Sequence, residues 1–285
     1  MGGDRRKRVR DHFASRSHRA DVWRAFDLVL ETDTFLNLGY SAWYQPHPLG
    51  SSQRRLVAEV GNRLAGAGPP GRSLLDVGCG RGGPAVAFAS WFGFDVTGVD
   101  LVRKNVSRAR ARARARDINA AFVVGDATAL PFADGTFAAC TSVDALVYVP
   151  NRRAAFEQIA GVLEPGGVLI VTDLVRAASA NLAAVDAFAD AWDMPPLDTA
   201  GAYEQWLSDA GFRVERLENI STHSVGRFRR YTTPFVALVD SPAGGLVRRG
   251  LDRYGLDPAV VLDQIRRAHR ALPDLRHVAI TAVAE

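Results

Sequence analysis

A glycine-rich run with an acid at its start has the residue types and spacing to hold a ligand. The run LLDVGCGRGG spans residues 74–83 and places Asp76 two positions before Gly78, with Gly80 and Gly83 following. Glycines directly after a strand let the backbone approach a ligand closely, and the next helix offers free N–H groups. The spacing of Gly78, Gly80 and Gly83 also fits the dinucleotide pattern GxGxxG, so on spacing alone the ligand could be a dinucleotide.

Two further acids indicate which ligand this is. Asp100 ends a second apolar run about 20 residues further on, where a carboxylate can hold ribose hydroxyls. Asp126 ends a third run and could accept a hydrogen bond from an adenine amine. Asp76 argues against a dinucleotide, because a carboxylate at the mouth of the loop would repel a pyrophosphate. It suits S-adenosylmethionine, which carries an ammonium and a sulfonium and no phosphate.

Strand-like and helix-like runs alternate from residue 73 onward, and they must position these residues. Such alternation predicts βαβ units and an α/β fold with a parallel sheet. Ligands of such sheets bind outside the carboxyl ends of the strands. The predicted strands lie at residues 73–78, 94–100, 120–127, 135–143, 168–174, 213–221 and 277–285.

The pattern divides the chain into four parts. We expect a helical N-terminal cap at 1–66, a cofactor-binding core at 67–222, a cap insertion over the substrate pocket at 223–275, and the final core strand at 276–285. The insertion separates two strands by so many residues that it should carry its own structure and a share of the function.

Composition limits the classes of partner. With 285 residues and 47% hydrophobic content, the chain can bury a large core, and no apolar run is long enough to span a bilayer. Two cysteines, Cys79 and Cys140, form no disulfide framework, so we expect a cytoplasmic protein that binds no membrane. The net charge is +4, and the arginine-rich segment 103–116 is the obvious nucleic-acid candidate. Its apolar residues share one stripe and no aromatics are interleaved, so we interpret it as an amphipathic helix and expect no nucleic-acid partner.

Four motifs together resemble the class I S-adenosylmethionine-dependent methyltransferases. They are the glycine run at 74–83, VTGVD at 96–100, GDATALPF at 125–132 and VLEPGGVLIVTDL at 162–174, in the family's order. The segment LNLGY at 36–40 further resembles the branch that methylates natural products, sugars and prenyl-like molecules. The resemblance implies a Rossmann-like fold: a seven-stranded, mostly parallel sheet whose final strand is antiparallel, with a helical N-terminal cap and an inserted cap.

The resemblance also implies roles around the cofactor. The glycine loop, including Cys79 as a small filler, passes under the methionine moiety, and Tyr40 and Gln53 close over it. The residues expected to bind S-adenosylmethionine are Tyr40, Gln53, Asp76, Gly78, Cys79, Gly80, Asp100 at the ribose, Leu101 at the adenine, Asp126 and Ala127 at the adenine's polar edge, and Val143 through its carbonyl to the ammonium. We assign no metal ligand.

The acceptor side departs from the family. Members of this branch often carry a basic histidine after the fourth strand, where this chain has Val147 and Tyr148. Histidine-assisted O-methylation is therefore doubtful, and we expect Tyr148 and Asp173 to serve the reaction. His277 lies far from every motif in the sequence. For the acceptor, a small molecule that could be anionic or prenyl-like, we expect contacts from Trp43, Tyr44, His223, Arg227, Arg229 and Arg230.

Three alternatives stay open. The chain could bind S-adenosylmethionine and catalyse a cyclisation or pericyclic step without methyl transfer. It could methylate nucleic acid, although the strand-end position that reads DPPY or NPPF in such enzymes here reads VDAL, residues 143–146. It could also be a binding protein without catalysis. The oligomeric state does not follow from the sequence.

Overall fold

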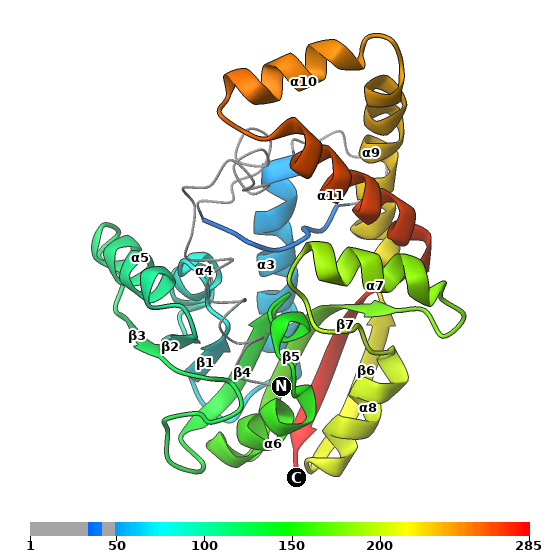
Figure 1. Ribbon diagram of the computed structural model, residues 1–285. Coiled ribbons are helices and arrows are strands. Elements are labelled where there is room, and N and C mark those ends of the chain that lie inside the picture. Colours follow the sequence, from blue (N-terminus) through cyan, green and yellow to red (C-terminus); the bar gives the residue numbers. More distant parts are fainter. Residues whose placement is uncertain (1–33, 42–48) are drawn as a thin grey trace.

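A single twisted sheet organises the molecule (Figure 1). The computed structural model describes residues 34–41 and 49–285. The sheet has seven strands in the order β3-β2-β1-β4-β5-β7-β6. They are β1 (Ser73–Val77), β2 (Asp95–Asp100), β3 (Ala120–Val124), β4 (Phe137–Val143), β5 (Leu163–Arg176), β6 (Phe212–Asn219) and β7 (Leu275–Ala284). Pairing is parallel except where β7 lies antiparallel between β5 and β6, which confirms the predicted fold class.

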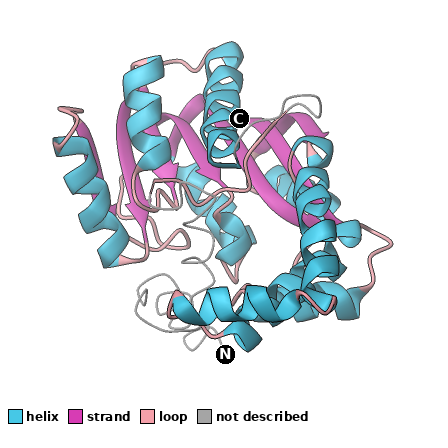
Figure 2. Cartoon of the chain, turned by 90° about the horizontal axis from the view of Figure 1, so that it is seen from above, coloured by secondary structure: helices cyan, strands magenta, loops and turns pink. Residues whose placement is uncertain are grey.

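Helices cover both faces of this sheet (Figure 2). The described helices are α3 (Leu49–Ala67), α4 (Gly83–Phe92), α5 (Arg103–Arg114), α6 (Arg152–Val162), α7 (Leu182–Ala191), α8 (Ala200–Asp209), α9 (Val225–Asp240), α10 (Gly244–Arg253) and α11 (Pro258–Ala271), with short 3-10 turns η1 (Leu146–Tyr148), η2 (Ser221–His223) and η3 (Leu272–Asp274). Residues of α3, α4 and α5 share one buried cluster with the sheet, and residues of α6 and α8 share another.

A third buried cluster joins α7, α9 and α11 above the strands' carboxyl ends. Helices α9 to α11 fill the long connection between β6 and β7. By contrast, α3 packs into the cluster on the sheet face, although the sequence pattern assigned it to the N-terminal cap. The division into four parts stays a prediction. None of the described helices has both the length and the apolar character needed to cross a bilayer.

Local sequence fixes the ends of the helices that border the sheet's carboxyl edge. α4 begins at the glycine pair of the loop with a proline in its first turn, where the missing N–H costs nothing. The Asn151 side chain accepts from the Ala154 N–H and so caps α6. These caps set where the loops after β1 and β4 end, and those loops form the site.

Candidate functional site

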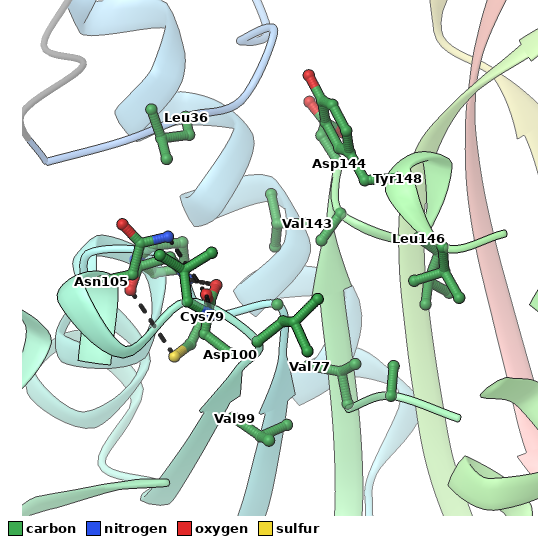
Figure 3. A pocket seen from close by; sticks show the side chains of 18 of the residues that line it. Leu36, Val77, Cys79, Val99, Asp100, Asn105, Val143, Asp144, Leu146 and Tyr148 are labelled. Carbon is green, nitrogen blue, oxygen red and sulfur yellow. Dashed lines mark hydrogen bonds between the residues drawn. The ribbon is translucent and has the colours of Figure 1, made fainter. Parts of the chain in front are cut away.

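A cavity opens at the carboxyl edge of the sheet, where β1 and β4 diverge (Figure 3). The chain runs from β1 towards β2 and β3 on one side and returns to β4 on the other, which is the point where α/β sheets bind ligands. The wall comes from the ends of four strands and from one segment near the N-terminal side. It consists of residues 77–81, 99–102, 125–127 and 143–146, together with Thr34, Leu36, Asn37, Pro84, Asn105, Tyr148, Val149 and Pro150.

The glycine loop forms the floor of this cavity, and position 78 requires glycine. Gly78 has φ 73°, in the left-handed region, and a Cβ there would lie 2.3 Å from the Cβ of Ala145. The backbone of the loop is therefore exposed to the cavity without a side chain in the way. A ligand that lies on the loop can therefore approach its backbone closely.

Asp100 ties the loop to the end of β2. Its Oδ2 accepts from the Gly80 N–H at 2.9 Å, and its Oδ1 accepts from the Val102 N–H at 2.8 Å and the Asn105 amide at 3.2 Å. Burial raises the pKa of this carboxyl, while the hydrogen bonds pull it back. A carboxylate held this rigidly at the cavity wall fits a pair of ribose hydroxyls.

Asp126 follows β3 and lines the cavity on that side. Its Oδ1 accepts from the Thr128 N–H at 2.9 Å and from the Thr128 hydroxyl at 2.8 Å. Leu101 and Ala127 line the cavity beside it. The apolar slot with one carboxylate suits the amine edge of an adenine, so the residues present fit the predicted cofactor. The individual roles stay predictions.

Asp76 lies behind the wall, in β1. It is 1% exposed, and Thr141 donates to its Oδ1 at 3.1 Å. Burial raises the pKa of Asp76 to about 7, and nearby Asp100 adds to the effect. Among the described residues no side chain donates to its Oδ2. A carboxyl group with a pKa near 7 is stabilised in its charged form by a nearby cation. This agrees with the positively charged ligand that the position of Asp76 indicates.

The segment after β4 forms the opposite wall. Val143 and Tyr148 line the cavity, and Tyr148 is half-buried in η1. Burial, followed by the charges of Asp173, Asp193 and Asp144, raises the pKa of the Tyr148 phenol. Figure 3 shows Tyr148 and Asp144 side by side across the cavity from Leu36.

The prediction that Asp173 lies at the end of the fifth strand was wrong. The strand β5 continues to Arg176, so Asp173 lies inside it, and successive side chains along a strand point to opposite faces. Thr172 contacts Asp144 at the cavity wall, whereas Asp173 is fully buried and accepts from the Tyr203 hydroxyl at 2.8 Å. Burial raises the pKa of Asp173 to about 8. It does not line the cavity.

Tyr40 and Gln53 also stand behind the wall instead of lining it. Gln53 is 1% exposed, and its amide donates to the carbonyls of Phe35 and Asn37, at 3.0 and 2.9 Å. The Tyr40 ring stacks on His223 with centroids 4.6 Å apart. In this structure Gln53 supports the segment that contains Leu36 and Asn37, and the contact of Tyr40 and Gln53 with the cofactor stays a prediction.

The four predicted acceptor residues that the structure describes do not line this cavity. His223 is occupied with Tyr40 and with the carbonyl of Ser41. Arg227 is half-buried in α9 and its guanidinium lies over the Tyr231 ring at 5.6 Å, while Arg229 and Arg230 are exposed on the same helix. The remaining two, Trp43 and Tyr44, lie outside the described residues.

Sequence reasoning missed His277. We expected it far from every motif, but it is fully buried in β7 and its Nε2 lies 2.8 Å from Asp144 Oδ1. The two residues are 133 positions apart, and the antiparallel insertion of β7 beside β5 brings them together. No local pattern marks such a pair.

Known proteins with similar sequences are methyltransferases. A family model described as a methyltransferase domain matches residues 74–167. The chain is 32% identical over 214 residues to O-methyltransferase resE of Aspergillus sclerotiorum, covering 70% of this chain and 79% of that protein. It is 30% identical over 230 residues to the 27-O-demethylrifamycin SV methyltransferase of Amycolatopsis mediterranei, covering 78% and 81%.

Solved structures share the fold across nearly the whole chain. The geranyl diphosphate C-methyltransferase of Streptomyces coelicolor superposes with a TM-score of 0.73 at 17% identity, covering 99% of this chain and 98% of that one. The cyclase SpnF superposes with a TM-score of 0.69 at 24% identity, covering 94% and 96%. At these identities the likeness concerns the fold alone.

Proposed function

Because this chain belongs to the class I S-adenosylmethionine-dependent methyltransferases that modify small molecules, we propose that it methylates an acceptor atom that needs no base from the enzyme. S-adenosylmethionine supplies a methyl group already activated by its sulfonium. The glycine loop, Asp100 and Asp126 would hold that cofactor, and Val143 would face its methionine end. The acceptor would enter beside Tyr148, below α7 and the α9–α11 insertion.

One observation carries the proposal: the wall after β4 offers two ionisable side chains, and neither is a base near neutral pH. Burial opposes charge on Asp144, but nearby His277 and hydrogen bonds from His277, Leu38 and Thr172 outweigh it and leave the pKa below its usual range. The Tyr148 phenol, with its raised pKa, keeps its own proton. Neither group would take a proton from an acceptor.

These residues can instead orient an acceptor and steady positive charge. An electron-rich carbon, as in an alkene, would attack the methyl carbon while its bond to sulfur breaks, which releases S-adenosylhomocysteine and leaves a carbocation. The carbocation would then give a proton to water, so no base of the enzyme has to act before methyl transfer. The Tyr148 ring and the Asp144 carboxylate lie side by side at the cavity wall (Figure 3), and both would favour such a cation. C-methylation is thus our finer proposal, and O-methylation of an acidic hydroxyl that ionises by itself is the alternative.

The pH dependence of labelled methyl transfer tests this proposal. With methyl-labelled S-adenosylmethionine at saturation, geranyl diphosphate as an alkene probe should give a kcat that is flat from about pH 6 to 9. With acidic phenols as probes, kcat should follow each phenol's own pKa. A kcat that follows one enzyme group with every acceptor would contradict the proposal. Turnover that leaves the label on the cofactor would instead support the cyclase alternative.

Substitution of Tyr148 separates its ring from its hydroxyl. We expect Tyr148→Phe to lower kcat by less than about tenfold, far from the roughly 10²–10⁴-fold of a lost acid or base. Tyr148→Ala should cost about 30-fold or more, because a desolvated cation–aromatic contact is worth about 2 kcal/mol. Single-turnover rates measure both, and the Kd of S-adenosylhomocysteine serves as the control. A Phe variant as slow as the Ala variant would show that the hydroxyl carries the chemistry.

The most specific version of this proposal is that the acceptor is an anion, such as a prenyl diphosphate. Its charged group would need arginine partners, and Arg229 and Arg230 are exposed on α9 outside the cavity. The acceptor would have to extend from Tyr148 to α9 to reach them. An anionic acceptor is therefore less well supported than methylation at a carbon atom.

A further inference from the structure

A chain of buried hydrogen bonds runs behind the cavity wall. His277 Nε2 lies 2.8 Å from Asp144 Oδ1, and His277 Nδ1 lies 2.8 Å from the Ser224 hydroxyl. The order Asp–His–Ser matches that of a hydrolase triad, but Ser224 is 1% exposed and its hydroxyl reaches the Ile220 carbonyl at 3.2 Å. A nucleophile enclosed in this way cannot meet a substrate. The arrangement positions other groups.

Asp144 is the member that reaches the cavity. Its Oδ1 also accepts from the Thr172 hydroxyl at 2.7 Å, and its Oδ2 accepts from the backbone N–H of Leu38 at 2.8 Å. Its φ of 54° lies in the left-handed region, which a non-glycine residue adopts only when its surroundings hold it there. The carboxylate thus joins β4, β5 and β7 to the segment around Leu38.

That segment, residues 34–41, covers the cavity, and we call it the strap. Thr34, Leu36 and Asn37 contribute to the cavity wall. Gln53 holds the carbonyls of Phe35 and Asn37 from α3. The strap is therefore fixed from one side by an amide of α3 and from the other by Asp144.

The far end of the strap meets the same network. The Ser41 N–H donates to the His223 carbonyl at 2.9 Å, and the Ser221 hydroxyl accepts from the His277 N–H at 2.9 Å. Residues 221–224 form the turn from which α9 begins. His277 consequently contacts both the residue that holds the strap and the start of the insertion.

We propose that His277 is a positioning residue that acts through Asp144: it keeps the strap closed over the cofactor and couples the strap to the start of the insertion. The inference rests on the assignment of the cavity to S-adenosylmethionine. Without the imidazole, the buried carboxylate of Asp144 loses one of its hydrogen-bond partners. Asp144 then leaves its strained conformation, and the Leu38 N–H loses its acceptor.

Two variants of His277 test this. His277→Leu removes both ring nitrogens at similar size, and His277→Gln keeps an amide N–H that can reach Asp144. For His277→Leu we expect hydrogen exchange of the Leu38 amide to be at least about tenfold faster in the free protein. The Kd of S-adenosylhomocysteine, measured by calorimetry well below the melting temperature, should rise about tenfold or more. His277→Gln should restore most of both.

Tyr203→Phe is the matched control. It removes a buried hydrogen bond to the carboxyl of Asp173 on the opposite face of β5, so its loss of stability resembles that of His277→Leu. It should leave strap exchange and the Kd unchanged. If His277→Leu also leaves both unchanged while losing stability, its role is structural and the inference is wrong.

A milder variant covers the case in which His277→Leu does not fold. Ser224→Ala keeps the contact between His277 and Asp144 but removes the ring's second partner, and we expect an intermediate increase in strap exchange. Wild-type exchange in Ser224→Ala would overturn the coupling to the insertion. Hydrogen exchange is measured in the free protein, so it tests the role of His277 even if the protein does not bind S-adenosylmethionine. Failure of the wild type to bind S-adenosylmethionine would refute the proposed function alone.

Discussion

Replacement of Arg152 by alanine is expected to lower the free energy of unfolding by about 3–5 kcal/mol. Arg152 is 3% exposed at the first turn of α6. Its guanidinium donates to the carbonyls of Leu146, Val147 and Pro196, at 3.1, 2.6 and 3.1 Å, and pairs with Asp198. The variant leaves these acceptors without their donor in the interior, and equilibrium denaturant unfolding measures the loss.

Arg153 is the matched control for this prediction. It follows Arg152 directly in the same helix, but it is exposed and pairs with Glu157 at 3.2 Å on the surface. Arg153→Ala should change the free energy of unfolding by no more than about 1 kcal/mol. Equal losses in the two variants would show that the guanidinium does not hold η1, the turn that carries Tyr148.

Substitution of Gly78 should have the largest effect on cofactor binding. Gly78→Ala inserts a Cβ 2.3 Å from that of Ala145, so either the loop or the wall after β4 must move. Overpacking of this kind costs about 1–3 kcal/mol. Because each 1.4 kcal/mol is about tenfold in affinity, we expect the Kd of S-adenosylhomocysteine to rise about 5- to 140-fold in calorimetric titration.

Gly211→Ala separates backbone strain from the clash. Gly211 has φ 88°, yet an added Cβ would meet nothing within 4 Å. Its variant should lose stability through strain alone and keep wild-type affinity for S-adenosylhomocysteine. Weakened binding in both variants would mean that Gly78 matters through global stability and not through the shape of the cavity.

The parts of the site that could be predicted from sequence are those formed by neighbours in the chain. The glycine loop, Asp100 and Asp126 follow strands directly, and the alternation of strands and helices identifies all seven strands. The direction in which a side chain points is harder to predict from the sequence. Gln53 lies in α3 and Tyr40 in the strap, and the family pattern does not say that they support the strap from behind.

Long-range pairing explains the remaining differences. Asp173 lies inside β5 and not at its end, because the strand continues to Arg176 through pairing with β7, which the local sequence does not show. The contact of Asp144 with His277 depends on the same pairing. Arg152 is buried because η1 and the loop before α8 present their carbonyls to it, and both lie outside its own helix.

The position of β7 between β5 and β6 has a consequence for how the chain folds during synthesis. β7 pairs with β5 and β6 on its two sides, although the ribosome makes it after both of them. Until residues 275–284 emerge, β5 offers an unpaired apolar edge and β6 has no strand beside it, an arrangement prone to association with other chains. The same late strand delivers His277, so a nascent chain can form the glycine loop early but completes the wall around Asp144 last.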